Sequence, residues 1–78
     1  MKAIINALVS VNGFDIALVS EPIKSELSIA TRNGETKEIV DKQSFKISDP
    51  ADVAAAFEKF SQSITWAVQT SDVDSKTV

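Results

Sequence analysis

The feature that most restricts the fold is the pair Asn12-Gly13, which interrupts an alternating run of apolar residues. Asparagine and glycine both accept the positive φ that a two-residue type I′ hairpin turn requires at its central positions. A turn here sorts the flanking side chains into an apolar face and a mixed face, and therefore predicts a β-hairpin. The apolar face holds the pairs Val11–Phe14, Val9–Ile16 and Ala7–Leu18, and the mixed face holds Ser10–Asp15, Leu8–Ala17 and Asn6–Val19.

A helix is the competing interpretation of residues 3–11. Ile4, Leu8 and Val11 would form its apolar stripe, and Gly13 would end it. The β-branched residues in this segment favour a strand, but short apolar runs fit both patterns, so both alternatives stay open.

The only other glycine also follows an asparagine, in Asn33-Gly34, and predicts a second hairpin. Residues 23–31 alternate, with Ile23, Leu27 and Ile29 on one face. A three-residue loop, 32–34, would pair Leu27 with Ile39 and Ile29 with Lys37. Residues 36–47 place Ile39, Phe45 and Ile47 on one side, and Val40, Lys42, Ser44 and Lys46 on the other. Lysines at these positions suit an exposed edge strand.

The strongest periodicity in the chain predicts a helix from about residue 50 to 70. Asp49 can cap its first free N–H groups, Pro50 suits the first helical position, and Asp52 suits the positive end of the helix dipole. The apolar stripe that should face the sheet consists of Val53, Phe57, Phe60, Ile64 and Val68.

These elements predict an α+β fold: a four-stranded antiparallel meander (ββββα) covered on one face by the long C-terminal helix. Residues 1–70 would form a single compact domain and 71–78 a flexible tail. If residues 3–11 are helical, the order becomes αβββα. A chain of 78 residues buries a small core, and without cysteine no disulfide supports it, so a second copy of the chain is one source of added stability.

The net charge of −3 argues against a broad nucleic-acid surface, which needs an excess of basic residues on one face. The N-terminal apolar run is broken by Asn6, Ser10 and Asn12, which does not fit a signal peptide. No stretch reaches the roughly 18 apolar residues of a membrane span. We therefore expect a cytoplasmic protein with no membrane association.

The chain contains no histidine, cysteine or tyrosine, which removes the commonest general base, the thiol nucleophile and the commonest metal ligands. The carboxylates Glu35, Glu38 and Asp41 alternate with lysines, as on a solvated strand. We therefore predict no catalytic residues, no metal site and no cofactor, and expect that the protein is not an enzyme.

Trp66, the only tryptophan, is the most informative side chain. At about 100° per residue it falls almost opposite the predicted stripe, beside Lys59 and Gln62. An exposed tryptophan next to a lysine and an amide is typical of a protein contact. The alternative is that a loop or the tail covers it, or that the helix is packed on both sides. Lys42 and Lys46 form a second candidate contact, or else protect the sheet edge from pairing.

The stretch NGETKEIVDKQSFKISDPADVAAAFEKF, residues 33–60, resembles the end of bacterial ABC-transport auxiliary lipoproteins, where a hairpin leads into a long helix. It covers under half of the chain, and the lipid-attachment cysteine and signal peptide of those proteins are missing, so no function is carried over. In size, acidity and plan the chain also resembles many phage-encoded inhibitors of host defence systems.

Three functions are consistent with these features. The leading one is a non-enzymatic protein-binding module that occludes a partner surface, such as a phage or mobile-element inhibitor of a host protein complex. The second is a structural homodimer, paired through Trp66 or a sheet edge. The third is a small nucleic-acid-binding protein that uses Lys37, Lys42 and Lys46.

Overall fold

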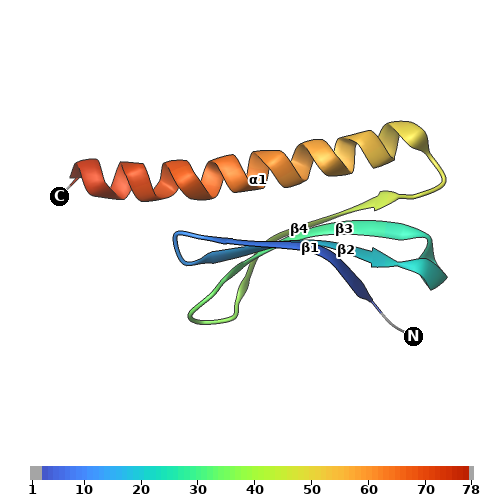
Figure 1. Cartoon of the computed structure of the whole chain (residues 1–78), viewed down its shortest axis with the longest axis horizontal. Coiled ribbons are helices and arrows are strands. Elements are labelled where there is room, and N and C mark those ends of the chain that lie inside the picture. Colours follow the sequence, from blue (N-terminus) through green and yellow to red (C-terminus); the bar gives the residue numbers. More distant parts are fainter. Residues whose placement is uncertain (1–2, 78) are drawn as a thin grey trace.

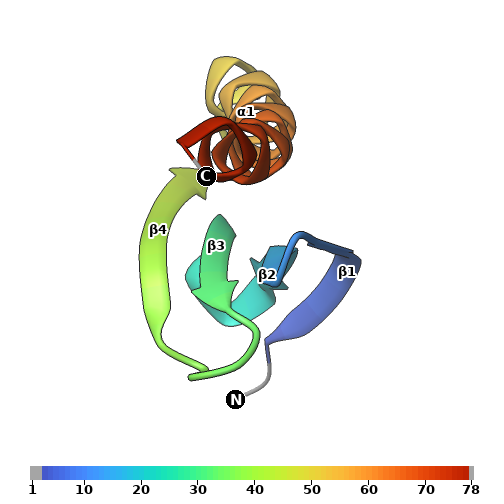
Figure 2. The same ribbon diagram turned by 90° about the vertical axis from the view of Figure 1, so that its left-hand side faces the viewer.

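A computed structural model describes the backbone of residues 3–77 and the side chains of residues 3–70. It contains one antiparallel sheet in the order β1-β2-β3-β4 and one helix that covers a single face of this sheet (Figures 1 and 2). The predicted α+β meander is confirmed, and the αβββα alternative is wrong, because residues 4–11 form a strand. The elements are β1 (Ile4–Val11), β2 (Phe14–Glu21), the 3-10 turn η1 (Pro22–Lys24), β3 (Glu26–Asn33), β4 (Ile39–Lys46) and α1 (Pro50–Thr77).

The first hairpin forms around Asn12-Gly13 as predicted. Asn12 and Gly13 have φ values of 53° and 84°, the positive values that a type I′ turn needs. Of the six predicted pairs, five are present and one is wrong: Val19 pairs with Ile5 instead of Asn6. A β-bulge at Asn6 inserts one extra residue, so the alternation along β1 changes at this point.

The second hairpin differs from its prediction. Leu27 pairs with Phe45 and Ile29 with Gln43, so the predicted partners Ile39 and Lys37 are wrong. The loop is longer because the side-chain oxygen of Asn33 accepts the N–H groups of the residues two and three positions further on, at 2.8 and 3.0 Å. This Asx-type turn holds residues 34–38 outside the sheet, and the pairing then starts later in β4.

Gly34 serves a different purpose from Gly13. Its φ is not in the positive range, and its N–H donates to the carbonyl oxygen of Gly13 at 2.7 Å. A Cβ at position 34 would lie 3.0 Å from that same oxygen, which is a very close contact. The two Asn-Gly pairs therefore meet in space, and glycine allows the tips of the two hairpins to approach each other.

Two further expectations for the second hairpin are wrong. Ile23 belongs to η1 instead of a strand and is exposed, because β3 starts only at Glu26. A register shift next to Ile39 makes Val40 the irregular residue of β4. As a result Ile39 lies on the face of the sheet away from α1, whereas Phe45 points toward α1, so the two do not share a side.

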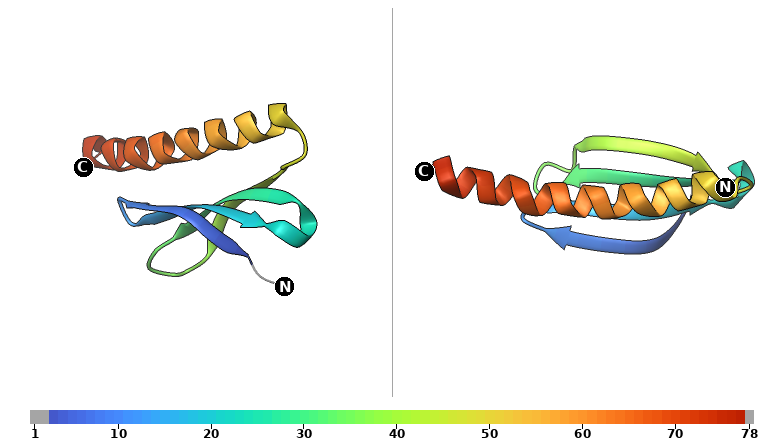
Figure 3. Two further views of the ribbon diagram at one scale, coloured as in Figure 1. Left: turned by 45° about the vertical axis from the view of Figure 1, so that its right-hand side comes forward. Right: turned by 90° about the horizontal axis from the view of Figure 1, so that it is seen from above.

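The start of α1 follows the prediction. The N–H of Ala51 donates to Oδ1 of Asp49 at 3.0 Å, and Pro50 is the first helical residue. Asp52 in the first turn also accepts the N–H of Lys46 at 3.1 Å, which fixes the helix start to the end of β4. The backbone of α1 continues to Thr77, beyond the predicted end near residue 70, and runs past the end of the strands (Figures 1 and 3). The mobility predicted for residues 71–78 stays a prediction.

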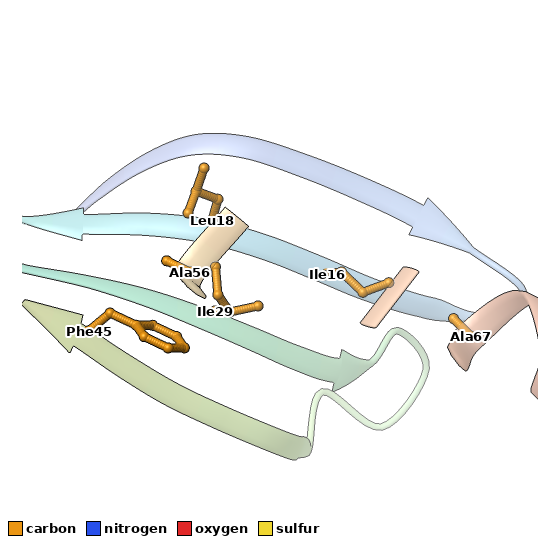
Figure 4. Close-up of a cluster of buried hydrophobic side chains, with 6 residues drawn as sticks. All are labelled: Ile16, Leu18, Ile29, Phe45, Ala56 and Ala67. Atoms are coloured by element: carbon orange, nitrogen blue, oxygen red, sulfur yellow. The ribbon is translucent and has the colours of Figure 1, made fainter. Parts of the chain in front are cut away.

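The core lies between α1 and one face of the sheet (Figure 4). The sheet supplies the bulky side chains and the helix supplies small ones, which lets the helix lie close to the strands. Phe60 and Ile64 pack at the side of this cluster. The buried apolar side chains are Ile16 and Leu18 of β2, Ile29 of β3, Phe45 of β4, and Ala56 and Ala67 of α1.

The helix is therefore rotated by roughly 80° from the orientation that its apolar stripe predicts. Ala56, Ser63 and Ala67 are buried, whereas Phe57 and Val68 remain 53% and 41% exposed. The prediction that Phe57 and Val68 face the sheet is thus wrong. The strands already fill the interface with large side chains, so volume decides which face of α1 is buried.

Candidate protein-binding groove

Trp66 lies on a flank of α1, not opposite the buried face, because of this rotation. Its side chain is 42% exposed. The indole packs against the ring of Phe14 in β2 in an edge-to-face arrangement, with centroids 4.9 Å apart and the planes at 61°. Such an edge-to-face pair holds an aromatic ring in one orientation. Trp66 is therefore anchored on one side and open to solvent on the other.

An ion pair lies on the same flank of α1, two turns before Trp66. Nζ of Lys59 is 2.9 Å from Oδ2 of Asp41 in β4, and both side chains are partly exposed. An exposed pair of this kind contributes about 0.2–1 kcal/mol, so it adds little stability. The ion pair connects one flank of α1 to β4. Strand β4 curves up beside the helix on this side (Figure 2).

A groove of about 420 Å³ opens between this flank of α1 and strands β3 and β4. We call it the Trp66 groove. It combines apolar surface with hydroxyl, amide and charged groups. The residues that line it are Thr31, Val40, Asp41, Lys59, Gln62, Ser63 and Trp66.

The register shift in β4 shapes the groove. Strict alternation would turn either Val40 or Asp41 away from the helix, but the irregularity at Val40 lets both line the groove. Thr31 and Ser63 are buried and bring hydroxyl groups to it. The result is an apolar surface of valine and indole with polar groups around it, an arrangement suited to binding one large side chain.

The structure brings three of the five predicted contact residues together. Trp66, Lys59 and Gln62 all line the groove. Lys42 and Lys46 lie on the other side of β4, because strand residues alternate and Phe45 between them points into the core. These two lysines are therefore not part of the same surface.

Four residues that line the groove were not predicted as contacts from the sequence: Thr31, Val40, Asp41 and Ser63. Asp41 was predicted only to belong to a charged, solvated strand. The others carry no sequence signal that points to a groove, because their position depends on the β4 irregularity and on the helix rotation.

The face of the sheet away from α1, which we call the open face, carries a second polar cluster. The hydroxyl of Ser10 donates to Oδ1 of Asp15 at 2.7 Å, and Nε of Arg32 donates to Oδ2 at 3.1 Å. These hydrogen bonds, first that of Ser10 and then that of Arg32, hold the pKa of Asp15 below its ordinary value of 3.8. The cluster connects β1, β2 and β3.

Charges of both signs share the open face. By strand alternation, Lys42 and Lys46 project there together with Asp15, Glu21 and Glu26. Lys46 is paired directly across from Glu26. The described part of this face is thus not a uniformly basic patch of the kind that binds phosphate backbones.

Among the side chains of residues 3–70, no cluster of three or more histidine, cysteine, aspartate or glutamate residues has the arrangement of a metal site. Within residues 3–77, no helix has both the length and the apolar content needed to cross a membrane.

Comparison with known proteins gives no match to this chain among protein families, curated proteins or solved structures.

Proposed function

We propose that this chain is a non-enzymatic protein-binding module whose Trp66 groove receives one bulky apolar side chain of a partner protein. The observation that carries the proposal is the state of Trp66. Its ring is held on one side by Phe14 and is 42% exposed on the other, at the edge of a groove of about 420 Å³.

The chemistry of the groove suits a protein partner. Binding hot spots are typically aromatic residues beside a pocket, with polar groups around them that exclude water once the partner is bound. Here the indole and Val40 supply the apolar surface, and Gln62 and the Asp41–Lys59 ion pair supply the polar rim. The anchored indole loses little conformational freedom on binding, which favours affinity.

The module would act by covering the partner's surface. A small acidic chain without histidine, cysteine or tyrosine has few side chains that could catalyse a reaction. Covering a partner's surface requires no catalytic side chain. Its most concrete form is an inhibitor, encoded by a phage or another mobile element, that covers a surface of a host protein complex.

The test compares Trp66→Ala with Phe57→Ala. Both variants remove a partly exposed aromatic ring from α1, but from opposite flanks of the helix. After affinity capture identifies a partner, the dissociation constant of each variant is measured with the purified partner by calorimetry. We expect Trp66→Ala to weaken binding by a factor of about 30 or more, as at interface hot spots, and Phe57→Ala to change it less than threefold.

Circular dichroism serves as the control that both variants are folded. Equal effects of the two substitutions would reject the Trp66 groove as the binding site. So would a partner that binds Trp66→Ala as tightly as the wild-type chain.

A further inference from the structure

The two most deeply buried residues of the Trp66 groove both carry a hydroxyl group. Thr31 of β3 is 2% exposed and Ser63 of α1 is 6% exposed, whereas Trp66 is 42% exposed. Thr31 and Ser63 therefore form the floor of the groove, and we call their two side-chain groups the floor hydroxyls. Burial of a hydroxyl costs free energy unless a hydrogen bond replaces the water that it loses.

Within residues 3–70, neither floor hydroxyl makes a hydrogen bond to another protein group. The third buried polar side chain of this range, Ser28, shares a hydrogen bond of 3.1 Å with Ser44. On the exposed face of α1, the hydroxyl of Thr65 donates to the carbonyl oxygen of Ser61 at 3.1 Å. The floor hydroxyls have no comparable partner, although they are the more deeply buried groups.

The floor hydroxyls are open to the groove. Among the described side chains, no nitrogen or oxygen is both completely enclosed and without a hydrogen-bond partner. The oxygens of Thr31 and Ser63 therefore keep some accessible surface, and the groove that both residues line provides it. A ligand that displaces solvent from the floor has to form hydrogen bonds there in its place, or it leaves buried hydroxyls unsatisfied.

We propose that the partner side chain that enters the Trp66 groove is a tyrosine. This inference rests on the proposed function and identifies the residue that binds there. The aromatic ring of the tyrosine packs against Trp66 and Val40, which supply the apolar surface of the groove. Its phenolic hydroxyl reaches the floor, where it can donate a hydrogen bond to one floor hydroxyl and accept one from the other.

The charges and polar groups of the groove favour tyrosine over other large side chains. Asp41 and Lys59 neutralise each other in their ion pair, which favours an uncharged ligand over lysine, arginine or a carboxylate. Phenylalanine, leucine or methionine would leave both floor hydroxyls without a partner, and tryptophan can donate a hydrogen bond but cannot accept one. The 78 residues of this sequence contain no tyrosine, so a second copy cannot supply the side chain and the partner is a different protein.

The test uses N-acetyl-tyrosinamide and N-acetyl-phenylalaninamide as probes, which differ only in the phenolic hydroxyl. NMR titration of the isotope-labelled chain gives the dissociation constant of each probe. The signals to follow are the indole N–H of Trp66 and the backbone amides of Thr31 and Ser63. We expect millimolar binding of the tyrosine probe and at least about tenfold weaker binding of the phenylalanine probe.

A double variant, Thr31→Val with Ser63→Ala, removes both floor hydroxyls with little change in side-chain shape. It should bind the two probes with equal affinity. The control, Thr65→Val with Ser61→Ala, makes the same chemical changes on the exposed face of α1, outside the groove, and should keep the wild-type preference. The comparison of the two probes on the wild-type chain does not require any variant to fold.

Equal affinity of the wild-type chain for both probes would overturn the tyrosine assignment and leave the proposed function intact, because an aromatic ring would still bind in the groove. Shifts with neither probe up to its solubility limit would overturn both. Tighter binding of N-acetyl-argininamide, which can stack on the indole and pair with Asp41, would overturn the assignment in favour of a cationic side chain. A double variant that still prefers the tyrosine probe would also overturn it.

Discussion

Replacing Phe57 with alanine is expected to cost little stability, whereas the same change at Phe60, one turn further along α1, is expected to remove a large part of it. Both residues belong to the apolar stripe that the sequence predicts. The structure separates them, because Phe57 is 53% exposed whereas Phe60 packs against the buried cluster. The pair therefore tests the rotation of α1 directly.

The magnitudes follow from burial. Full burial of a phenylalanine side chain contributes about 1.5–3 kcal/mol to the free energy of unfolding. Because Phe57 is more than half exposed, its replacement by alanine should lower this free energy by about 1 kcal/mol. Truncation of phenylalanine in a core costs about 3–5 kcal/mol, and because Phe60 is partly exposed, its loss is expected at the lower end, about 3 kcal/mol. A domain of this size has a free energy of unfolding of only about 4–12 kcal/mol, so the difference is easily measured.

Urea denaturation followed by far-ultraviolet circular dichroism measures both losses. It should be carried out at low micromolar concentration to limit self-association. An unchanged dependence on urea would show that each substitution acts on stability alone. If Phe57→Ala cost as much as Phe60→Ala, the stripe predicted from sequence would be the buried one, and the rotation and the Trp66 groove would both be refuted.

Two further predictions concern the hairpin tips and the open face. Gly13→Ala should cost about 1–2 kcal/mol in urea denaturation although no atom lies near, because φ there is 84°. Gly34→Ala should instead push the two tips apart and speed exchange of the amide at position 34; unchanged exchange would contradict the close contact with Gly13. Ser10→Ala should raise the pKa of Asp15 toward 3.8, measured by NMR titration, and an unaltered titration would contradict the role of this hydrogen bond. Because the folded-state pKa of Asp15 is lowered, its contribution to stability is present above pH 3.8 and is lost as the pH falls through the folded-state pKa.

Local chemistry explains which elements could be predicted. The turn at Asn12-Gly13 and the helix start at Asp49-Pro50 depend on residues at most a few positions apart, so both were predicted from the sequence, although a helix that ends at Gly13 stayed open as an alternative to the turn. The second hairpin also begins with Asn-Gly, but there the side chain of Asn33 captures two backbone N–H groups and lengthens the loop. The same dipeptide thus produces a different turn, and the predicted register was wrong.

The candidate site could be predicted only in part. The sequence indicates Trp66, Lys59 and Gln62, because they share a helix face regardless of how the helix is oriented. It does not indicate Val40 and Asp41, which the β4 irregularity turns toward the helix. It also indicated Lys42 and Lys46 as a second candidate contact, and these two lysines lie on the other side of β4.

By itself, the sequence predicted an α+β chain that ends in a long helix, the start of α1 and the residue types available for a contact, and it left residues 3–11 open between a strand and a helix. The tertiary structure decided how α1 is rotated, and with it whether Trp66 lies opposite the core or beside a groove. The physical reason is volume. The strands fill the interface with Ile16, Leu18, Ile29 and Phe45, so the helix packs with its alanines toward the sheet. The apolar periodicity of the helix sequence contains no information on the size of these strand side chains, so it could not predict which face is buried.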